Sequence, residues 1–409
     1  MQQQVILAYS GGLDTSVILK WLLNKGYEVT AFIADVGQEE DFAAAKAKAL
    51  AIGAKTVVIE DCKEEFVNDY IYPSLQSGAL YENRYLLGTS LARPLIAKKL
   101  VEYALAHGIK NISHGATGKG NDQIRFELVF MQFMPEVKVI APWKEPEFLA
   151  QFKGRTDLLN YAAEQGIPVT STLQKPYSVD ENLMHTSYEA GILEDPELAP
   201  PAEMFKKTLS PQDAPDETFE ISIEFKNGLP IKITEYASQK VISGTQLEIF
   251  TYLNKIGGNN AIGRIDIVES RFVGMKSRGV YETPGGTILH KAYQDLETLV
   301  LDREVILLKS CAAPKIAQLI YNGFWFSPEM KMLMAANQVS LAAINGVVHL
   351  ALYKGNVIIL GRNSPNSLYN HDIASMDRLG DYDQTDAKGF IKLNALRLKK
   401  QTITPKMKQ

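Results

Sequence analysis

Two glycine-rich segments of the chain hold residues whose types and spacing suit chemistry. The first runs from Ala8 to Ser16 and reads Ala-Tyr-Ser-Gly-Gly-Leu-Asp-Thr-Ser. Its glycines let backbone N–H groups approach an anion without a Cβ in the way. The hydroxyls of Ser10, Thr15 and Ser16 add donors, and the start of the following helix adds a positive dipole. The segment therefore predicts a phosphate-binding loop, although it matches neither the Walker A nor the dinucleotide pattern.

The second segment, residues 114–127, offers four different polar groups within nine residues. They are the hydroxyl of Thr117, the amide of Asn121, the carboxylate of Asp122 and the guanidinium of Arg125. The spacing of four puts Asn121 and Arg125 on one helix face. A guanidinium grips a carboxylate with two hydrogen bonds, and a carboxylate pairs with an ammonium group. These groups predict a site that holds amino-acid zwitterions.

The elements that must position these segments follow a β-α pattern over the first 165 residues. Short apolar runs predict strands at 5–9, 29–34, 56–59, 111–113 and 137–140, and helical periodicity predicts helices at 14–25, 42–52, 89–106 and 122–134. Repeated β-α units imply a parallel sheet with right-handed crossovers. Each glycine-rich segment stands at a strand-to-helix junction, which is where open α/β sheets bind ligands.

The pattern changes after Pro168. Five prolines between residues 196 and 216 predict an irregular connection or lid. Alternating residues around Asn227-Gly228 predict a β-hairpin, and strands at 339–344 and 347–353 are expected to form a second one. Helices are expected over 247–256 and, as one or two, over 287–320. Residues 170–365 are therefore expected to form an α+β unit with an antiparallel sheet.

The last predicted helix covers residues 387–400. Phe390, Leu393, Leu396 and Leu398 form an apolar stripe on it. Such a helix at a chain end either docks on its own domain or reaches a neighbouring subunit.

Composition excludes several classes of protein. The 409 residues include 43 Lys and Arg and 47 Asp and Glu, a net charge of −4 that argues against a dedicated nucleic-acid binder. Cys62 and Cys311 form no CxxC, and no two of the six histidines form an HxxxH pair, so neither a zinc ribbon nor a histidine-built metal site is expected. The N-terminus lacks the basic region of a signal peptide, and no apolar run reaches the length of a membrane span. We expect a cytoplasmic protein.

Beyond these derivations, several segments resemble known families. The 8–16 segment resembles the pyrophosphate loop of N-type ATP pyrophosphatases, which split ATP between the α- and β-phosphates. The 114–127 segment resembles the HGATGKGNDQ-type motif of the argininosuccinate synthase family. Further stretches that match this family occur in order at Tyr85–Pro94, Tyr177–Leu183, His185–Ser187, Ile262–Glu269 and Gly279–Pro284.

The resemblance implies a fold and a reaction. The fold is α/β, with an adenine nucleotide alpha hydrolase-like ATP-binding domain at 1–168, an α+β synthetase and multimerisation domain at 169–368, and a C-terminal oligomerisation helix and tail at 369–409. The reaction joins citrulline and aspartate to argininosuccinate through a citrullyl-adenylate, with ATP giving AMP and pyrophosphate, in arginine biosynthesis. Mg²⁺ on the phosphates and a homotetramer are also implied, without nucleic acid or membrane.

The resemblance also implies the site residues. ATP is assigned to Ala8, Tyr9, Ser10, Gly11, Gly12, Leu13, Asp14, Thr15, Ser16, Ala34 and Gly115. Citrulline is assigned to Tyr85, Ser90, Asn121, Arg125, Ser178, Ser187, Glu269 and Tyr281. Aspartate is assigned to Thr117, Asn121 and Asp122. No protein ligand of the metal and no general base is assigned.

Two other functions remain open from the residues alone. One is a different N-type ATP pyrophosphatase, such as a tRNA-modifying enzyme, although sulfur-transferring members need a cysteine within a motif. The other is a nucleotide-binding module without turnover. Taken singly, the tyrosines of the assigned site would be core or rim aromatics and its serines would be helix or turn hydroxyls.

Overall fold

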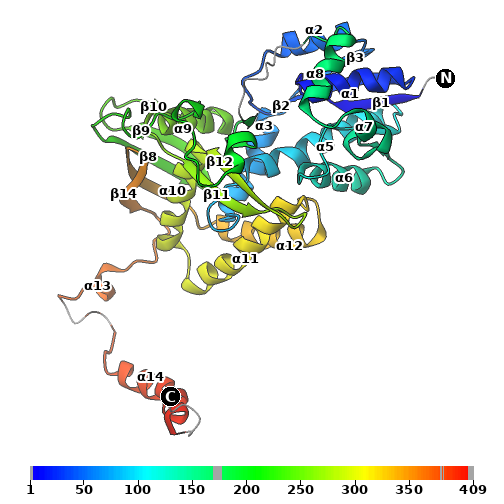
Figure 1. The fold of residues 1–409 in the computed structure, drawn as a ribbon. Coiled ribbons are helices and arrows are strands. Elements are labelled where there is room, and N and C mark those ends of the chain that lie inside the picture. Colours follow the sequence, from blue (N-terminus) through cyan, green and yellow to red (C-terminus); the bar gives the residue numbers. More distant parts are fainter. Residues whose placement is uncertain (1–2, 169–176, 378–379, 381, 404–409) are drawn as a thin grey trace.

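A computed structural model describes residues 3–168, 177–377, 380 and 382–403 of the chain, and the side chains only as far as residue 400. The first 168 residues form the blue-to-teal body of Figure 1, and residues 177–365 form the green-to-orange body beside it. The expected domain boundary at 168/169 borders residues 169–176, which lie outside the described residues. Residues 404–409, at the end of the expected C-terminal tail, lie outside them too.

The N-terminal body is built on five parallel strands in the order β3-β2-β1-β4-β5. The order reverses at β1, which has β2 on one side and β4 on the other, so the sheet has a switch point at the carboxyl ends of β1 and β4. The prediction of a parallel sheet is confirmed. The strands are β1 Gln4–Ala8, β2 Glu28–Asp35, β3 Thr56–Asp61, β4 Asn111–Ser113 and β5 Lys138–Ile140.

Helices cover both faces of this sheet. Along β1, Val5 and Leu7 enter the apolar core that α1 and α2 share, whereas Ile6 enters the core that α5 and α6 share. A strand buried on both sides needs the continuous apolar run that the sequence shows. The helices are α1 Leu13–Asn24, α2 Phe42–Ile52, α5 Gly88–Ala106, α6 Asp122–Phe133, α7 Pro146–Gln151 and α8 Arg155–Glu164. Between β3 and α5 the chain forms α3 Lys63–Phe66, a π-helical turn at 67–71 and α4 Tyr72–Gln76, none of which was expected.

The second body contains an antiparallel sheet in the order β10-β9-β8-β13-β14. The predicted hairpin around Asn227 is confirmed as β8 and β9. The predicted hairpin around Asn345 is wrong, because β13 pairs with β14 and β8. The strands are β8 Phe219–Lys226, β9 Leu229–Glu235, β10 Val241–Ile242, β13 Gly346–Tyr353 and β14 Asn356–Asn363.

Residues 339–341, expected in a strand, instead end helix α12 (Pro328–Leu341). A local start signal explains this helix. The hydroxyl of Ser327 accepts a hydrogen bond from the backbone N–H of Met330 at 3.3 Å, and Pro328 occupies the first helical position. The apolar run at its end therefore continues a helix that had already begun.

A third sheet, which the sequence analysis did not separate from the second, has the order β11-β12-β7-β6. Its strands β11 and β12 lie on the side of the second body that faces the N-terminal body (Figure 1). Its strands are β6 Ser178–Glu181, β7 Thr186–Glu189, β11 Arg264–Ser270 and β12 Lys276–Glu282. Helices α9 (Gln246–Asn259), α10 (Pro284–Val300) and α11 (Arg303–Asn322) complete this body, and the expected 287–320 segment is two helices because Asp302 caps the second one.

The proline-rich connection at 196–216 is attached to the body at several places, and most of the hydrogen bonds go to Glu282. The buried carboxylate of Glu282 accepts hydrogen bonds from the backbone N–H groups of Lys206 at 2.9 Å and Thr208 at 2.8 Å, and from the hydroxyl of Tyr188 at 2.5 Å. The guanidinium of Arg264 lies over the ring of Phe205. This connection is therefore irregular in backbone but firmly attached to β12.

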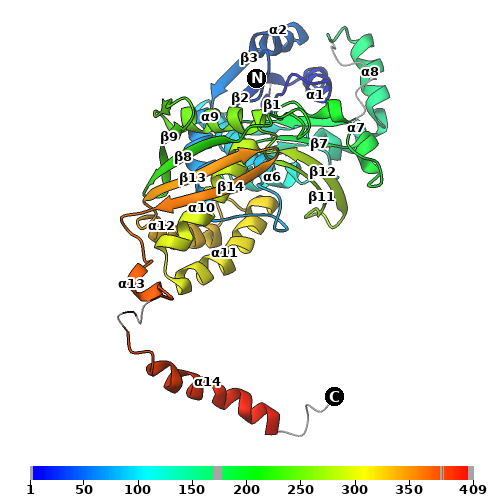
Figure 2. The ribbon, with the colours of Figure 1, turned by 90° about the vertical axis from the view of Figure 1, so that its left-hand side faces the viewer.

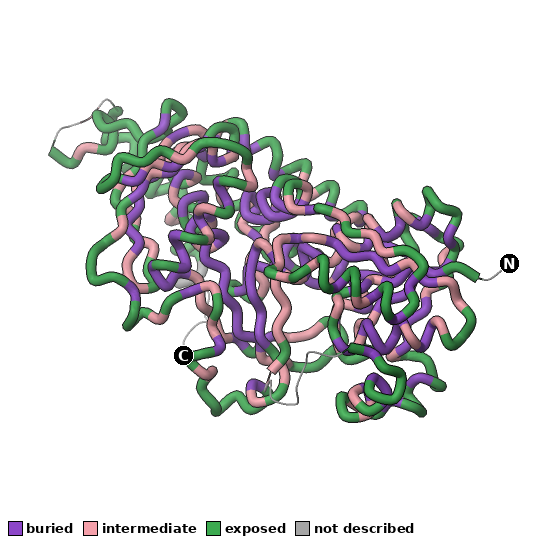
Figure 3. The backbone as a smooth tube through the Cα atoms, turned by 90° about the horizontal axis from the view of Figure 1, so that it is seen from above, coloured by how far each residue is buried: buried purple, intermediate pink, exposed green. Residues whose placement is uncertain are grey.

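The C-terminal residues leave the body (Figures 1 and 2). After α13 (His371–Ala374), helix α14 (Asp386–Ile403) stands apart from the rest of the chain, and this confirms the predicted terminal helix. The four side chains of its apolar stripe are each more than half exposed. Buried residues concentrate instead along the sheets of the two bodies (Figure 3). No helix within the described residues is long and apolar enough to cross a membrane.

Candidate active site

The 8–16 segment forms a loop between β1 and α1. Gly12 is the N-cap of α1, so Asp14 lies in the first turn and is not the cap. Gly11 has φ +71°, and a Cβ there would lie 3.0 Å from Oε1 of Glu40. The hydroxyls of Ser10 and Thr15 are 3.1 Å apart. The loop thus presents the free N–H groups of a helix start and two hydroxyls at the carboxyl end of β1.

A lysine that the sequence analysis missed supports this loop. Nζ of Lys48, on α2, donates to the carbonyl oxygen of Gly11 at 2.7 Å. Burial lowers the pKa of Lys48, while the neighbouring Glu40 opposes that effect. Burial also raises the pKa of the Asp14 carboxyl. No pattern of spacing pointed to Lys48, since it stands mid-helix with no motif around it.

The 114–127 segment follows β4 and approaches the first loop. A Cβ on Gly115 would lie 3.2 Å from the methyl group of Thr15, so the two loops are in close contact. The ring of His114 is fully buried. Its Nδ1 accepts from the N–H of Ala116 at 3.2 Å, and its Nε2 lies 3.0 Å from Oε1 of Glu127. The buried imidazole of His114 therefore holds the loop backbone through the N–H of Ala116.

A polar cavity of about 400 Å³ lies between these loops and the third sheet. Most of the predicted substrate residues line it, together with two of the predicted ATP residues. Those present are Asp14, Tyr85, Gly115, Thr117, Asn121, Asp122, Arg125, Ser178, Ser187, Glu269 and Tyr281. The structure thus brings together residues from both bodies that are far apart in sequence.

The other predicted residues lie outside the cavity wall. Ser90 is fully buried on α5, and its hydroxyl has no hydrogen-bond partner among the described residues. Ala34 is near the carboxyl end of β2, the neighbour of β1. The remaining residues of the first loop, 8–13 with Thr15 and Ser16, adjoin Asp14 but do not line the cavity.

The guanidinium of Arg125 is already partly engaged. Its Nε and Nη2 both donate to the carbonyl oxygen of Tyr321, at 3.0 and 2.8 Å, and its Nη1 donates to Oδ1 of Asp122 at 2.8 Å. Two arginines already contact the carboxylate of Asp122, so the substrate ammonium group predicted to bind there would share it with them. Arg93 is the second, with its Nε 2.8 Å from Oδ2 of Asp122.

Aromatic rings form one wall of the cavity around Glu269. Its carboxylate accepts hydrogen bonds from the hydroxyls of Tyr321 at 2.7 Å and Tyr281 at 3.1 Å. Burial raises the pKa of Glu269 despite these two donors. Tyr281 stacks on Tyr85, and Tyr321 stacks on Tyr81 with ring centroids 3.7 Å apart. The two hydrogen bonds and the stacked rings therefore restrict the side chain of Glu269 to one orientation.

The turn between β11 and β12 closes another side of the site. The N–H of Phe272 donates to Oδ1 of Asn121 at 3.0 Å, which leaves the amide NH₂ without a partner among the described residues. Arg271 forms an ion pair with Glu189 at 2.5 Å. The sequence analysis assigned neither of these two contacts.

Seven polar residues that line the cavity were missed. Three of them had a signal, since Thr89 and Arg93 stand within the matched 85–94 stretch and Asp180 stands within 177–183. The others had none, because only the folded chain brings them here. The seven are Thr89, Arg93, Asp180, Tyr188, Glu189, Arg271 and Tyr321.

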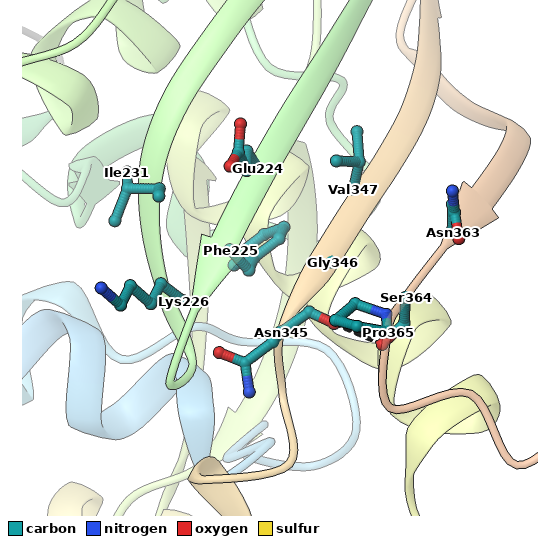
Figure 4. Close-up of a pocket in the computed structure, with 10 residues that line it drawn as sticks. All are labelled: Glu224, Phe225, Lys226, Ile231, Asn345, Gly346, Val347, Asn363, Ser364 and Pro365. Carbon is teal, nitrogen blue, oxygen red and sulfur yellow. Dashed lines mark hydrogen bonds between the residues drawn. The ribbon is translucent and has the colours of Figure 1, made fainter.

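A separate hollow of about 490 Å³ lies at one end of the sheet that contains β8 and β13 (Figure 4). It is lined by residues of β8, β9, β13 and the end of β14, including Lys226, and by neighbouring residues such as Asn345. None of its lining residues lines the cavity described above. This hollow is therefore no part of the candidate site.

A parallel sheet with a phosphate-type loop at its switch point, which opens on a cavity rich in charged groups, defines a nucleotide-dependent α/β enzyme. Two family models match the chain: "Arginosuccinate synthase N-terminal HUP domain" over residues 4–168 and "Arginosuccinate synthase C-terminal domain" over residues 177–401. The HUP domain implies that the nucleotide is ATP.

Curated relatives extend over nearly the whole chain. The chain is 55% identical over 410 residues to argininosuccinate synthase of Thermotoga maritima, with 99% of each chain covered. It is 54% identical over 395 residues to the enzymes of Danio rerio and Homo sapiens, with 97% of this chain and 95% or 96% of theirs covered. The chain belongs to the argininosuccinate synthase family, a family of ligases.

Proposed function

We propose that this chain joins citrulline and aspartate to form argininosuccinate, and that ATP is split to AMP and pyrophosphate through a citrullyl-adenylate. One observation carries the proposal. Asp14 of the phosphate-type loop and Tyr281 of the third sheet line the same cavity, so nucleotide and amino acids would meet there. Full-length similarity to argininosuccinate synthases supports it.

ATP is assigned to the first loop, with Ala34 and Gly115 near the adenosine. The free N–H groups at the start of α1 and the hydroxyls of Ser10 and Thr15 would bind phosphate oxygens, as helix N-termini do. Lys48 holds the carbonyl of Gly11 back toward α2, which keeps that acceptor away from an anion. The loop would thus bind the leaving pyrophosphate and stabilise its developing charge.

Citrulline is assigned to the tyrosine and serine side of the cavity and aspartate to the Thr117 side. The Nη1 and Nη2 groups of Arg125 each keep one hydrogen beyond those used for Asp122 and Tyr321, so a carboxylate can still be bound there. Glu269 offers negative charge for the citrulline ammonium. Ser90, also assigned to citrulline, is buried on α5 with a hydroxyl that has no hydrogen-bond partner among the described residues.

The reaction itself needs positioning more than a protein nucleophile. The ureido oxygen of citrulline is a weak neutral nucleophile. Holding it in line with the α-phosphorus raises its effective molarity, which can lower the barrier by up to ~7–11 kcal/mol. The aspartate amine then attacks the ureido carbon and AMP leaves. The side chains around the cavity orient the two zwitterions for these steps.

Magnesium is assigned to the phosphates of ATP. No group of three or more His, Cys, Asp or Glu side chains in the described part of the chain is placed to hold a metal ion. Mg²⁺ keeps several waters and binds through substrate phosphates with few protein ligands. When bound, it neutralises phosphate charge.

The remaining assignments concern organisation. We assign residues 1–168 to ATP binding, 169–368 to the synthetase domain and 369–409 to oligomerisation, in a cytoplasmic homotetramer. The exposed apolar stripe of α14, which stands away from its own body, supports contact with another copy.

A pyrophosphate-release assay tests the function. With ATP and Mg²⁺, release should require both citrulline and aspartate, and omission of either should reduce it to background. Glu269→Gln keeps the size of the side chain and removes its charge, so the citrulline KM should rise, while Glu329→Gln on the surface of α12 serves as the matched control. Release without citrulline would contradict the proposal, and tight tRNA binding in a filter assay would favour a tRNA-modifying enzyme.

A further inference from the structure

We propose that Arg93 is a positioning residue for aspartate: it separates two anionic side chains, Asp122 and Asp180, and thereby keeps Asp122 charged for the substrate ammonium group. The inference rests on the proposed function, because it takes aspartate as the ligand of Asp122. Nothing in the sequence patterns assigned a role to Arg93.

The geometry places one guanidinium between two carboxylates from different bodies. Arg93 lies on α5, and its Nε donates to Oδ2 of Asp122 on α6 at 2.8 Å. Its Nη2 donates to Oδ2 of Asp180 on β6, also at 2.8 Å. Only 16% of the Arg93 side chain is exposed, and the ring of Phe126 lies 6.0 Å from its central carbon. A lysine could not reach both acids in these two directions, since it lacks the planar fork.

The two carboxylates each keep some capacity for a ligand. Oδ1 of Asp122 accepts from Arg125, and Oδ2 of Asp180 accepts from the hydroxyl of Thr89 at 2.9 Å as well as from Arg93. Oδ1 of Asp180 has no partner among the described residues. Both acids line the cavity. Without Arg93, the carboxylates of Asp122 and Asp180 would be two like charges in the cavity that no longer share a cation.

The charged groups around this cluster do not replace Arg93. Arg125 contacts Asp122 but not Asp180. Arg271, from the β11–β12 turn, is paired with Glu189 of β7. His185, in the turn before β7, lies beside Thr89, and burial lowers its pKa to about 4, so it is neutral near pH 7. Arg93 is therefore the cation that both acids share.

The charge state of Asp122 depends on this arrangement. Burial alone would raise its pKa, but Arg93 and Arg125 outweigh burial and lower the pKa to about 2. A like charge nearby raises the pKa of a carboxyl group. Loss of Arg93 should therefore make the Asp122–Asp180 pair take up its first proton at a higher pH, and aspartate binding should weaken as the pH falls through that value.

The test compares pH profiles of kcat/KM for aspartate in wild type, Arg93→Met and the double variant Arg93→Met/Asp180→Asn. We expect the acid limb to shift upward by about one pH unit or more in Arg93→Met. Removing the second acid should move the limb back toward wild type, a rescue that a merely structural role of Arg93 would not give. Lys98→Met, on the same helix but in an ion pair with Glu65, is the control and should leave the profile unchanged.

A second measurement does not depend on turnover. The carboxyl ¹³C resonance of Asp122, assigned by its loss in Asp122→Asn, should titrate at higher pH in Arg93→Met than in wild type. An unchanged resonance and an unchanged acid limb in folded Arg93→Met would overturn the inference. If Arg93→Met does not fold, Arg93→Gln, which also removes the charge, with and without Asp180→Asn gives the same comparison. A shifted resonance in a protein that releases no citrulline-dependent pyrophosphate would contradict the proposed function alone.

Discussion

Tyr85 and Tyr281 stack with ring centroids 4.1 Å apart and planes inclined by 21°. Tyr85 precedes α5 of the N-terminal body, and Tyr281 belongs to β12 of the third sheet. Both rings are buried, and the imidazole of His185 stacks beside them. The stack therefore fixes the distance between the two bodies at the cavity wall.

Two variants of Tyr281 should separate stacking from hydrogen bonding. Tyr281→Phe keeps the ring and removes the donor to Glu269, so the citrulline KM should rise while stability falls by only about 1 kcal/mol. Tyr281→Ala also removes the ring and should cost roughly 3–5 kcal/mol. Urea unfolding and steady-state kinetics measure both quantities. Equal stability of the two variants would show that the stack contributes nothing.

Gly323 ends α11 beside Arg125, and an added methyl group should disturb the site. It has φ +88°, and its Cβ would lie 2.9 Å from Cα of Arg125. Gly323→Ala should therefore raise the citrulline KM and lower stability by more than about 1 kcal/mol. Gly26→Ala is the matched control, since Gly26 has φ +85° with nothing within 4 Å of the new Cβ. If both variants had wild-type KM values, close packing at Gly323 would be irrelevant to binding.

Arg125→Ala should raise the citrulline KM by about one to two orders of magnitude, because a charged hydrogen-bonded contact is worth roughly 1.5–3 kcal/mol. Part of the effect would come from the released carbonyl of Tyr321, which loses two donors. Arg125→Lys should recover little, since an ammonium cannot make the same fork. A citrulline KM that stays at the wild-type value in Arg125→Ala would refute the assignment.

His185 should make stability depend on pH. Burial lowers its pKa to about 4 from an ordinary 6.5. Between these two values the imidazole is protonated in the unfolded chain and neutral in the folded chain. Stability should thus be complete above about pH 6.5 and fall by up to roughly 3 kcal/mol as the pH drops toward 4. His185→Gln should flatten this slope in urea titrations, whereas His371→Gln on the surface should not. A slope equal to wild type in His185→Gln would rule out this source.

Truncation before residue 386 should reduce the mass of the assembly in light scattering if α14 contacts another copy. Leu393→Ser and Leu396→Ser, on the exposed stripe, should have the same effect without shortening the chain. Lys392→Ser, on the same helix, is the control. An unaltered mass in the truncated chain would exclude α14 from the interface.

The N-terminal body was predictable because its signals are local. The continuous apolar run predicts strand β1, which is buried on both faces, and the left-handed glycine after α2 marks the end of that helix. The third sheet was not, since β6 holds Ser178, Asp180 and Glu181 with a single apolar residue and resembles a loop. Likewise, motif stretches located Arg93 and Asp180 in the sequence, but their shared contact arises only when α5 and β6 pack together.

The order in which the site is completed along the chain has a consequence during synthesis. The first loop, β1 and β2 lie within the first 35 residues, whereas Tyr321, which contacts both Glu269 and Arg125, is made only after some three quarters of the chain. A growing chain would carry a phosphate loop long before it has a pocket for the amino acid that ATP activates. Activation needs ATP and the amino acid to be held in line with each other. An unfinished chain, which lacks the amino-acid pocket, would therefore have no means to hydrolyse ATP.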